Sequence, residues 1–149
     1  MSIAINKRAL FDYEILEKFE AGVVLTGAEV KSVKNRHISL KGAYVTFKNG
    51  EAYLLNAHIS PYQKAGKIIG YDPTKTRKLL LNKNELKRLL GKLKEKGLTI
   101  VPLKVYTTRR GRIKIEIGLG RGKKQYEKRE LIKKREVDRE IRSNLKSKK

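Results

Sequence analysis

The sequence contains no cysteine, no long apolar stretch and few acidic residues. Without cysteine, disulfides and thiolate metal sites are excluded, and a reducing compartment is no obstacle to folding. The longest unbroken apolar run, Ala52–Leu55, is far too short to cross a bilayer, and the N-terminus has no apolar segment of the secretory type. These absences predict a soluble, cytoplasmic protein that does not cross a membrane.

Acidic side chains are outnumbered by basic ones, with 15 Asp and Glu against 37 Lys and Arg, so the formal net charge is +22. A polyanion is the obvious partner, because each phosphate neutralised by Lys or Arg releases condensed counterions. An anionic membrane surface is the weaker alternative.

The positive charge is most concentrated at the C-terminal end. Residues 121–149 hold 13 basic and 5 acidic side chains, a net charge of +8, and contain neither Phe nor Trp. A segment with so little apolar surface cannot offset the entropy of its own ordering. We therefore predict a folded domain at 1–120 and a basic tail at 121–149, joined by a glycine-rich hinge at Gly118–Gly122.

Most of the first 120 residues have the pattern of β-strands. From Tyr13 to Leu25, apolar and polar residues alternate at period two, with Glu17 as the one discordant residue, which predicts a half-buried strand. Asn49-Gly50 is the strongest short hairpin signal and joins two further strands. The predicted strands cover residues 13–25, 43–48, 51–59, 78–81, 98–107 and 112–119.

Two short helices also have clear signals. Thr26 and Glu29 have the spacing of a capping box. Four leucines between Leu86 and Leu93 recur at helical spacing after a cap at Asn82 or Asn84, and Gly97 is expected to end that helix. About six antiparallel strands are too many for an open flat sheet in so small a domain. We therefore predict a mainly β fold, a closed antiparallel barrel of the oligonucleotide-binding type, because closure removes exposed edges.

The sequence offers little that indicates an enzyme. Its two histidines, His37 and His58, do not lie at metal-ligand spacing from another histidine or a carboxylate pair. Gly118–Gly122 lacks the Lys-Ser/Thr ending of a phosphate-binding loop. We therefore predict no catalytic residue, no metal and no cofactor.

The tail has a helical pattern despite its composition. At about 100° per residue, its apolar residues share one sector, and several basic residues lie within about 60° of one another on a neighbouring sector. These basic residues are Lys128, Arg135, Arg139, Arg142 and Lys146. A disordered basic tail and a coiled-coil arm are the alternatives. We favour a tail that is disordered when free and becomes helical on contact with its partner.

Seven short motifs, taken in order, resemble one known family. They are Asn6-Lys7-Arg8-Ala9, Phe19-Glu20-Ala21-Gly22, Leu25-Thr26-Gly27 followed by Glu29-Val30-Lys31-Ser32, Asn49-Gly50-Glu51-Ala52, His58-Ile59-Ser60-Pro61, Asp72-Pro73 followed by Thr76-Arg77-Lys78-Leu79-Leu80-Leu81, and Gly122-Lys123-Lys124 followed by Lys128-Arg129. The series runs from about residue 3 to residue 142. It resembles the SsrA-binding protein (small protein B) family, the bacterial partner of transfer-messenger RNA.

The resemblance implies a function and a set of partners. Members of the family bind the tRNA-like domain of transfer-messenger RNA and carry it, with elongation factor Tu and GTP, to stalled ribosomes. Trans-translation then releases the ribosome and tags the unfinished polypeptide. The family's core is a barrel of the oligonucleotide-binding type with three helices, and its body stands in for a missing anticodon arm. Its tail folds as a helix in the decoding centre and the empty mRNA channel. The resemblance further implies a monomer, one per RNA.

The resemblance also assigns contacts with the tRNA-like domain. They fall on Asn6, Lys7, Arg8, Tyr13, Glu20, Arg77, Lys78 and Leu80. A carboxylate such as Glu20 cannot contact phosphate favourably, but it can accept hydrogen bonds from base edges or ribose hydroxyls. Alternatively, the Glu20 carboxylate only compensates the positive charge of Lys18 or Arg8. Tyr13 either stacks on an unpaired base or packs in the barrel, and its place in the alternation favours packing.

In the tail, the resemblance and the basic stripe together predict the residues that meet the ribosome. Tyr126 is expected to stack on a ribosomal base, and the others to contact RNA through their charge or backbone. The set is Gly122, Lys123, Lys124, Tyr126, Lys128, Arg129, Lys133, Arg135, Arg139 and Arg142. A general RNA-binding module or ribosomal protein would share the charge and the barrel, but would not prefer a tRNA-like elbow over other folded RNA.

Overall fold

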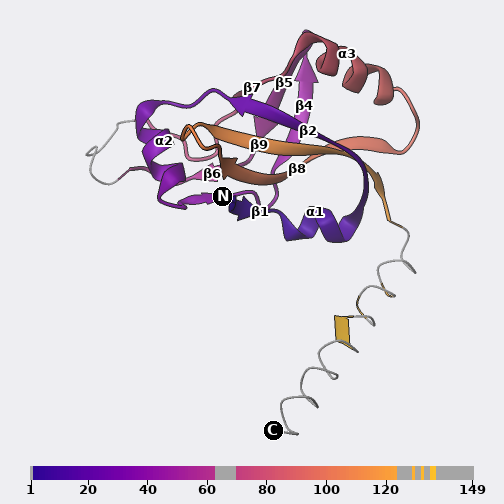
Figure 1. Cartoon of the computed structure of the whole chain (residues 1–149), viewed down its shortest axis with the longest axis horizontal. Coiled ribbons are helices and arrows are strands. Elements are labelled where there is room, and N and C mark those ends of the chain that lie inside the picture. Colours follow the sequence, from indigo (N-terminus) through magenta and orange to yellow (C-terminus); the bar gives the residue numbers. More distant parts are fainter. Residues whose placement is uncertain (1, 63–69, 124–128, 130–131, 133–134, 137–149) are drawn as a thin grey trace, which may run out of the picture.

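The computed structural model describes residues 2–62 and 70–123, together with residues 129, 132 and 135–136 (Figure 1). Residues 2–62 and 70–123 form nine strands and three helices. The strands are β1 (Ser2–Ile5), β2 (Tyr13–Val23), β3 (Ile38–Ser39), β4 (Tyr44–Lys48), β5 (Glu51–Leu55), β6 (His58–Ile59), β7 (Arg77–Leu80), β8 (Leu98–Thr107) and β9 (Ile113–Gly122). The helices are α1 (Lys7–Asp12), α2 (Gly27–Lys34) and α3 (Lys83–Lys92).

Seven of the strands form one antiparallel sheet in the order β1-β8-β9-β2-β7-β5-β4, and β3 pairs with β6 in a small second sheet. The long strands β2, β8 and β9 make the centre of the main sheet (Figure 1). The mainly β, antiparallel prediction is therefore confirmed. Closure is not shown, because in the described part of the chain the edge strands β1 and β4 are not hydrogen-bonded to each other. Instead, β4 lies against β8.

The β4–β5 hairpin forms where Asn49-Gly50 predicts it. Lys48 pairs with Glu51, and the two turn residues have φ values of 54° and 75°, the left-handed conformation that a type I′ turn requires. The single strand predicted at 51–59 is instead divided into β5 and β6. Between them, Asn56 also adopts a left-handed backbone, with φ at 60°, which turns the chain out of the ladder.

A bulge in β2 reverses the faces that its residues occupy. The pairing of β2 with β9 shifts between Ile15 and Glu17, so one extra residue is inserted at this point. Before the bulge, Ile15 packs with Leu103 in a small cluster beside α1, whereas after it Phe19 enters the main core. The half-buried strand predicted at 13–25 forms, with burial that alternates along β2, but the apolar residues before and after the bulge pack in different clusters. The apolar–polar alternation of the sequence continues through the bulge, whereas the face of the sheet that the apolar residues occupy changes there.

The glycine-rich stretch predicted to be a hinge is part of a strand. Residues 118–122 end β9 and pair with both β2 and β8. A Cβ atom on Gly118 would lie 2.8 Å from Cδ1 of Leu103 and 3.0 Å from Cγ2 of Ile15. Glycine is therefore needed here for close packing, not for flexibility. The folded part extends at least to Gly122, and the division into domain and tail remains a prediction.

The three helices begin at the capping residues that the sequence supplies. In α2, the side chain of Thr26 accepts from the backbone of Glu29, and the Glu29 side chain accepts from the backbone of Thr26, so the predicted capping box is confirmed. Asn82 caps α3, whose Leu89 is fully buried. This helix ends at Lys92, a full turn before Gly97. Among the described residues, no helix is long and apolar enough to span a membrane.

Candidate nucleic-acid interface

The residues expected to contact the tRNA-like domain lie at two ends of β2. One group, the α1 cluster, consists of Asn6, Lys7, Arg8 and Tyr13. The other, the β2–β7 cluster, consists of Glu20, Lys78 and Leu80. Glu20 lies seven positions after Tyr13 along β2, which corresponds to ~23 Å of extended strand. The predicted set therefore forms two surfaces instead of one.

Asn6 is a helix cap instead of a free surface group. It is 8% exposed, its Oδ1 accepts from the backbone N–H of Ala9 at 3.2 Å, and its Nδ2 donates to the carbonyl of Pro102 at 2.9 Å. These bonds start α1 and tie it to β8. Asn6 therefore supports Lys7 and Arg8 from beneath the surface, and its own contact with RNA stays a prediction.

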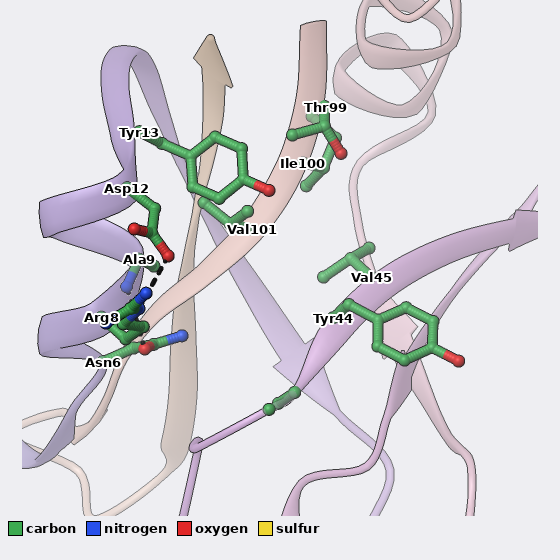
Figure 2. Close-up of a pocket in the computed structure, with 12 residues that line it drawn as sticks. Asn6, Arg8, Ala9, Asp12, Tyr13, Tyr44, Val45, Thr99, Ile100 and Val101 are labelled. Atoms are coloured by element: carbon green, nitrogen blue, oxygen red, sulfur yellow. Dashed lines mark hydrogen bonds and ion pairs between the residues drawn. The ribbon is translucent and has the colours of Figure 1, made fainter. Parts of the chain in front are cut away.

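Arg8 and Tyr13 line a pocket of about 250 Å³ between α1, β4 and β8 (Figure 2). Arg8 is exposed; its Nε lies 2.9 Å from Oδ2 of Asp12, and its guanidinium carbon lies 5.7 Å from the centre of the Phe11 ring. Tyr13 is half-buried, and Tyr44 lies on the other side of the pocket (Figure 2). Tyr13 therefore packs in the fold and also borders an open pocket, so the two interpretations of this residue are compatible.

The tail leaves the folded part beside α1. The backbone N–H of Lys123 donates to the carbonyl of Asp12 at 2.8 Å, and its Nζ donates to the carbonyl of Leu10 at 3.1 Å. Gly122 pairs with Tyr13 across β2 and β9. The α1 cluster and the first two residues of the predicted tail set are consequently one continuous surface.

Four residues of the tail beyond Lys123 are described. Arg129, Ile132, Arg135 and Glu136 are helical and exposed, and the guanidinium carbon of Arg135 lies 5.8 Å from the centre of the Phe11 ring. The other predicted contacts of the tail lie outside the described residues. They are Lys124, Tyr126, Lys128, Lys133, Arg139 and Arg142.

In the β2–β7 cluster, Leu80 is 53% exposed and pairs with Gly22 of β2, two residues from Glu20. Lys78 is also exposed, with its Nζ 3.7 Å from Oε2 of Glu51. The cluster thus places a carboxylate, an apolar side chain and an ammonium group on one face. Such a surface can accept hydrogen bonds from ribose hydroxyls and base edges while it attracts the RNA backbone.

Glu20 does not pair with either of the cations that the alternative interpretation names. Lys18 lies 3.8 Å from Glu116, and Arg8 pairs with Asp12 at the other end of β2. The exposed Glu20 carboxylate instead accepts a hydrogen bond from the hydroxyl of Tyr106. Its charge is therefore not neutralised within the described part of the protein.

Arg77 does not belong to this surface. The two-residue period of β7 turns Arg77 and Leu79 inward and Lys78 and Leu80 outward, and Arg77 is only 2% exposed. The prediction that Arg77 contacts RNA is therefore corrected. Its guanidinium is already occupied inside the protein.

A buried network holds the Arg77 guanidinium. Nε lies 2.7 Å from Oε2 of Glu29, NH1 donates to the carbonyl of Ala57 at 2.8 Å, and NH2 donates to the carbonyl of Pro73 at 3.0 Å. Burial by itself raises the pKa of Glu29, but the backbone hydrogen bond from Thr26 and the charge of Arg77 outweigh it, so the net pKa is lowered. Glu29 is therefore ionised, and the pair ties α2 to β7.

Sequence reasoning missed Tyr106 and its neighbours Lys104 and Lys114. The alternation in 112–119 places polar side chains on one face of that strand, and Lys104 and Tyr106 alternate with Leu103 and Val105 in 98–107. That pattern alone does not predict their proximity to Glu20, because proximity depends on the register of three strands. The observed register opposes Tyr106 to Lys114 and Glu20 to Glu116.

The fold and these surfaces can be compared with known proteins. A profile described as SmpB protein matches residues 3–147. The chain belongs to the SmpB protein family. It is 53% identical over 146 residues to the SsrA-binding protein of Sulfurihydrogenibium sp. (strain YO3AOP1), covering 98% of this chain and 95% of that protein. It is 51% identical over 144 residues to the SsrA-binding protein of Acaryochloris marina (strain MBIC 11017), and this match covers 97% of this chain and 93% of that protein.

A solved structure agrees with the family match. The SmpB-family chain superposes with a TM-score of 0.66 on a chain from the structure described as "tmRNA-SmpB: a journey to the center of the bacterial ribosome". The two are 52% identical, and the match covers 81% of this chain and 84% of the other. The resemblance carried by the seven sequence motifs is thereby confirmed.

Proposed function

We propose that this SmpB-family chain binds SsrA RNA, the transfer-messenger RNA, and acts with it on stalled ribosomes in trans-translation. It is an RNA-binding protein and not an enzyme. The observation that carries the proposal is the near full-length likeness to SsrA-binding proteins, at 53% identity over 98% of the chain. The net charge of +22 supports it, because phosphate neutralisation supplies much of the affinity for RNA.

Both clusters on the folded part contact the tRNA-like domain. At the α1 cluster, Lys7 and Arg8 meet phosphates and sugars and fix the register, and the pocket beside Tyr13 takes an unpaired base. At the β2–β7 cluster, Glu20 accepts hydrogen bonds from ribose hydroxyls or base edges, and Lys78 and Leu80 lie on the same face of the sheet. This division is supported by the exposure of these side chains and by the burial of Arg77.

The tail makes the contacts with the ribosome. It enters the decoding centre and the empty mRNA channel, starting from Gly122 and Lys123 beside α1. Its contacts continue through Lys124, Tyr126, Lys128, Arg129, Lys133, Arg135, Arg139 and Arg142. The helical backbone of residues 129, 132, 135 and 136 supports a tail that is helical in the channel. Elongation factor Tu with GTP joins the complex through the aminoacylated RNA, and the protein acts as a cytoplasmic monomer, one per RNA.

The main sheet has the architecture of a barrel of the oligonucleotide-binding type that is open between β1 and β4. The packing of β4 against β8 supports this description, because it brings the edge strand β4 against the strand next to the opposite edge, β1.

Replacing Glu20 by alanine is expected to weaken binding to the isolated tRNA-like domain by about 10- to 100-fold, because hydrogen bonds to a charged group are worth about 1.5–3 kcal/mol. The measurement is an equilibrium titration at fixed salt, with thermal unfolding to check the fold. Glu14→Ala is the matched control, since Glu14 is an exposed carboxylate on the same strand and its loss changes the net charge equally. Equal affinities of the two variants would contradict the role of Glu20.

A further inference from the structure

Three strands bring five polar side chains together around Glu20. In the register of β8, β9 and β2, Lys104, Glu116 and Glu20 form one row across the sheet, and Tyr106, Lys114 and Gly22 form the next. The side chain of Lys18 joins the first row through its ion pair with Glu116. The resulting set, the Tyr106 cluster, consists of Lys18, Glu20, Lys104, Tyr106, Lys114 and Glu116.

The two carboxylates of the Tyr106 cluster have different partners. Glu20 and Glu116 are directly opposed on neighbouring strands, an arrangement that is unfavourable unless each charge is compensated. Glu116 receives two cations, with Lys18 at 3.8 Å and Lys104 at 3.7 Å. In the described part of the chain, no Lys or Arg pairs with Glu20, which is bound by the neutral hydroxyl of Tyr106. The hydrogen bond from Tyr106 thus sets the direction of the Glu20 side chain without placing a cation against its carboxylate.

Tyr106 is itself held in place. It is half-buried, and Nζ of Lys104 lies 5.5 Å from the centre of its ring. Burial, the hydrogen bond to Glu20 and the charges of Glu20 and Glu116 raise the pKa of Tyr106. Its hydroxyl is therefore protonated at neutral pH and remains a donor.

A hydrogen bond from one hydroxyl leaves most of the acceptor capacity of Glu20 free. An ionised carboxylate has about four lone-pair sites, of which Tyr106 occupies one. An unrestrained glutamate on the surface would lose rotamer freedom when it bound RNA, and a side chain that is already oriented loses less. The hydroxyl of Tyr106 thus lowers the entropic cost of recognition without competing for all of the carboxylate.

We infer that Tyr106 is a positioning residue for RNA recognition, whose hydroxyl orients the Glu20 carboxylate toward ribose hydroxyls or base-edge donors of the bound RNA. The inference rests on the proposed function, and in particular on contact between Glu20 and RNA. It requires no contact between Tyr106 and RNA.

The test uses the full chain and the isolated tRNA-like domain of transfer-messenger RNA. Tyr106→Phe keeps the ring and removes only the hydroxyl, and it is expected to weaken binding by about 3- to 10-fold, less than the loss of a charged hydrogen bond to the RNA itself. The slope of affinity against salt is expected to stay unchanged, because no phosphate contact is lost. Tyr62→Phe is the matched control, since it also removes one hydroxyl from a half-buried ring, and it is expected to bind like the wild type.

A double-mutant cycle separates positioning from an independent contribution. In the Glu20→Ala background, Tyr106→Phe is expected to change affinity by less than about twofold, because there is no carboxylate left to orient. The same loss in both backgrounds, or wild-type affinity of Tyr106→Phe, would overturn the inference. If Glu20→Ala itself binds like the wild type while both variants fold, the proposed contact of Glu20 with RNA fails, and the role of Tyr106 fails with it.

Discussion

Replacing Arg77 by methionine is expected to lower the free energy of unfolding by about 3–5 kcal/mol, the cost of leaving a buried charge without its partner. The side chains of Arg77 and Glu29 are each 1% exposed, and Nε of Arg77 is 2.7 Å from Oε2 of Glu29. Lys75 also approaches Glu29, at 3.2 Å, but its side chain is 38% exposed and cannot replace the buried hydrogen bonds that Arg77 makes to Ala57 and Pro73.

The measurement is urea denaturation at pH 7. The pKa of Glu29 is lowered in the folded protein, so its stabilising contribution is complete above the pKa of an unfolded glutamate and is lost as the pH falls through the folded pKa. Lys78→Met is the matched control, because Lys78 is the next residue of β7 and its ion pair with Glu51 is exposed. The control is expected to change stability by no more than about 1 kcal/mol. Equal losses in the two variants would show that burial of the Arg77 pair contributes no special stability.

Removing residues 124–149 is expected to abolish tagging on stalled ribosomes, to below about 1% of the wild-type rate, since several contacts worth about 1–3 kcal/mol each are lost together. Affinity for the tRNA-like domain is expected to fall by less than about tenfold at near-physiological salt, because the lost charge contributes only a screened, nonspecific attraction. The chain that ends at Lys123 keeps the nine strands of the described residues, both core clusters found there and the hydrogen bond from Lys123 to Asp12.

A full-length chain in which residues 124–149 are scrambled, with the composition unchanged, separates charge from sequence. If the tail reads the ribosome through particular side chains, the scrambled chain binds the RNA normally and does not support tagging. If tagging persists with the scrambled tail, the tail supplies charge alone. A collapse of RNA affinity in the truncated chain would contradict the division of labour between the folded part and the tail.

The elements with strong local signals could be predicted from the sequence. The Asn49-Gly50 hairpin, the capping box at Thr26 and Glu29 and the helix around Leu89 depend on a few adjacent residues, and each forms where it is expected. The bulge in β2 could not be predicted, because an extra residue in one strand is defined only by the partner strand. The packing role of Gly118 is hidden for the same reason, since it depends on Leu103 and Ile15.

In the candidate site, too, features set by adjacent residues could be predicted and features set by partner strands could not. The period of β7 separates Arg77 and Leu79 from Lys78 and Leu80, but each face carries one cation and one leucine, so only the fold shows that Arg77 is buried. The partner of Glu20 does not follow from the sequence either, because Tyr106 reaches it from β8 across the whole width of β9. The family resemblance names residues that matter, but only the fold distinguishes those on the surface from those that support it.

We expect the folded part to recognise a tRNA-like structure and not merely to attract RNA. A salt-titrated binding comparison tests it most directly, with the full chain titrated against the tRNA-like domain of transfer-messenger RNA and against an elongator tRNA. We expect a preference of about tenfold or more for the tRNA-like domain that persists as salt rises, because contacts to ribose hydroxyls and base edges release few counterions. Equal affinities for the two RNAs that fall together with salt would contradict it and leave only a generic polyanion binder.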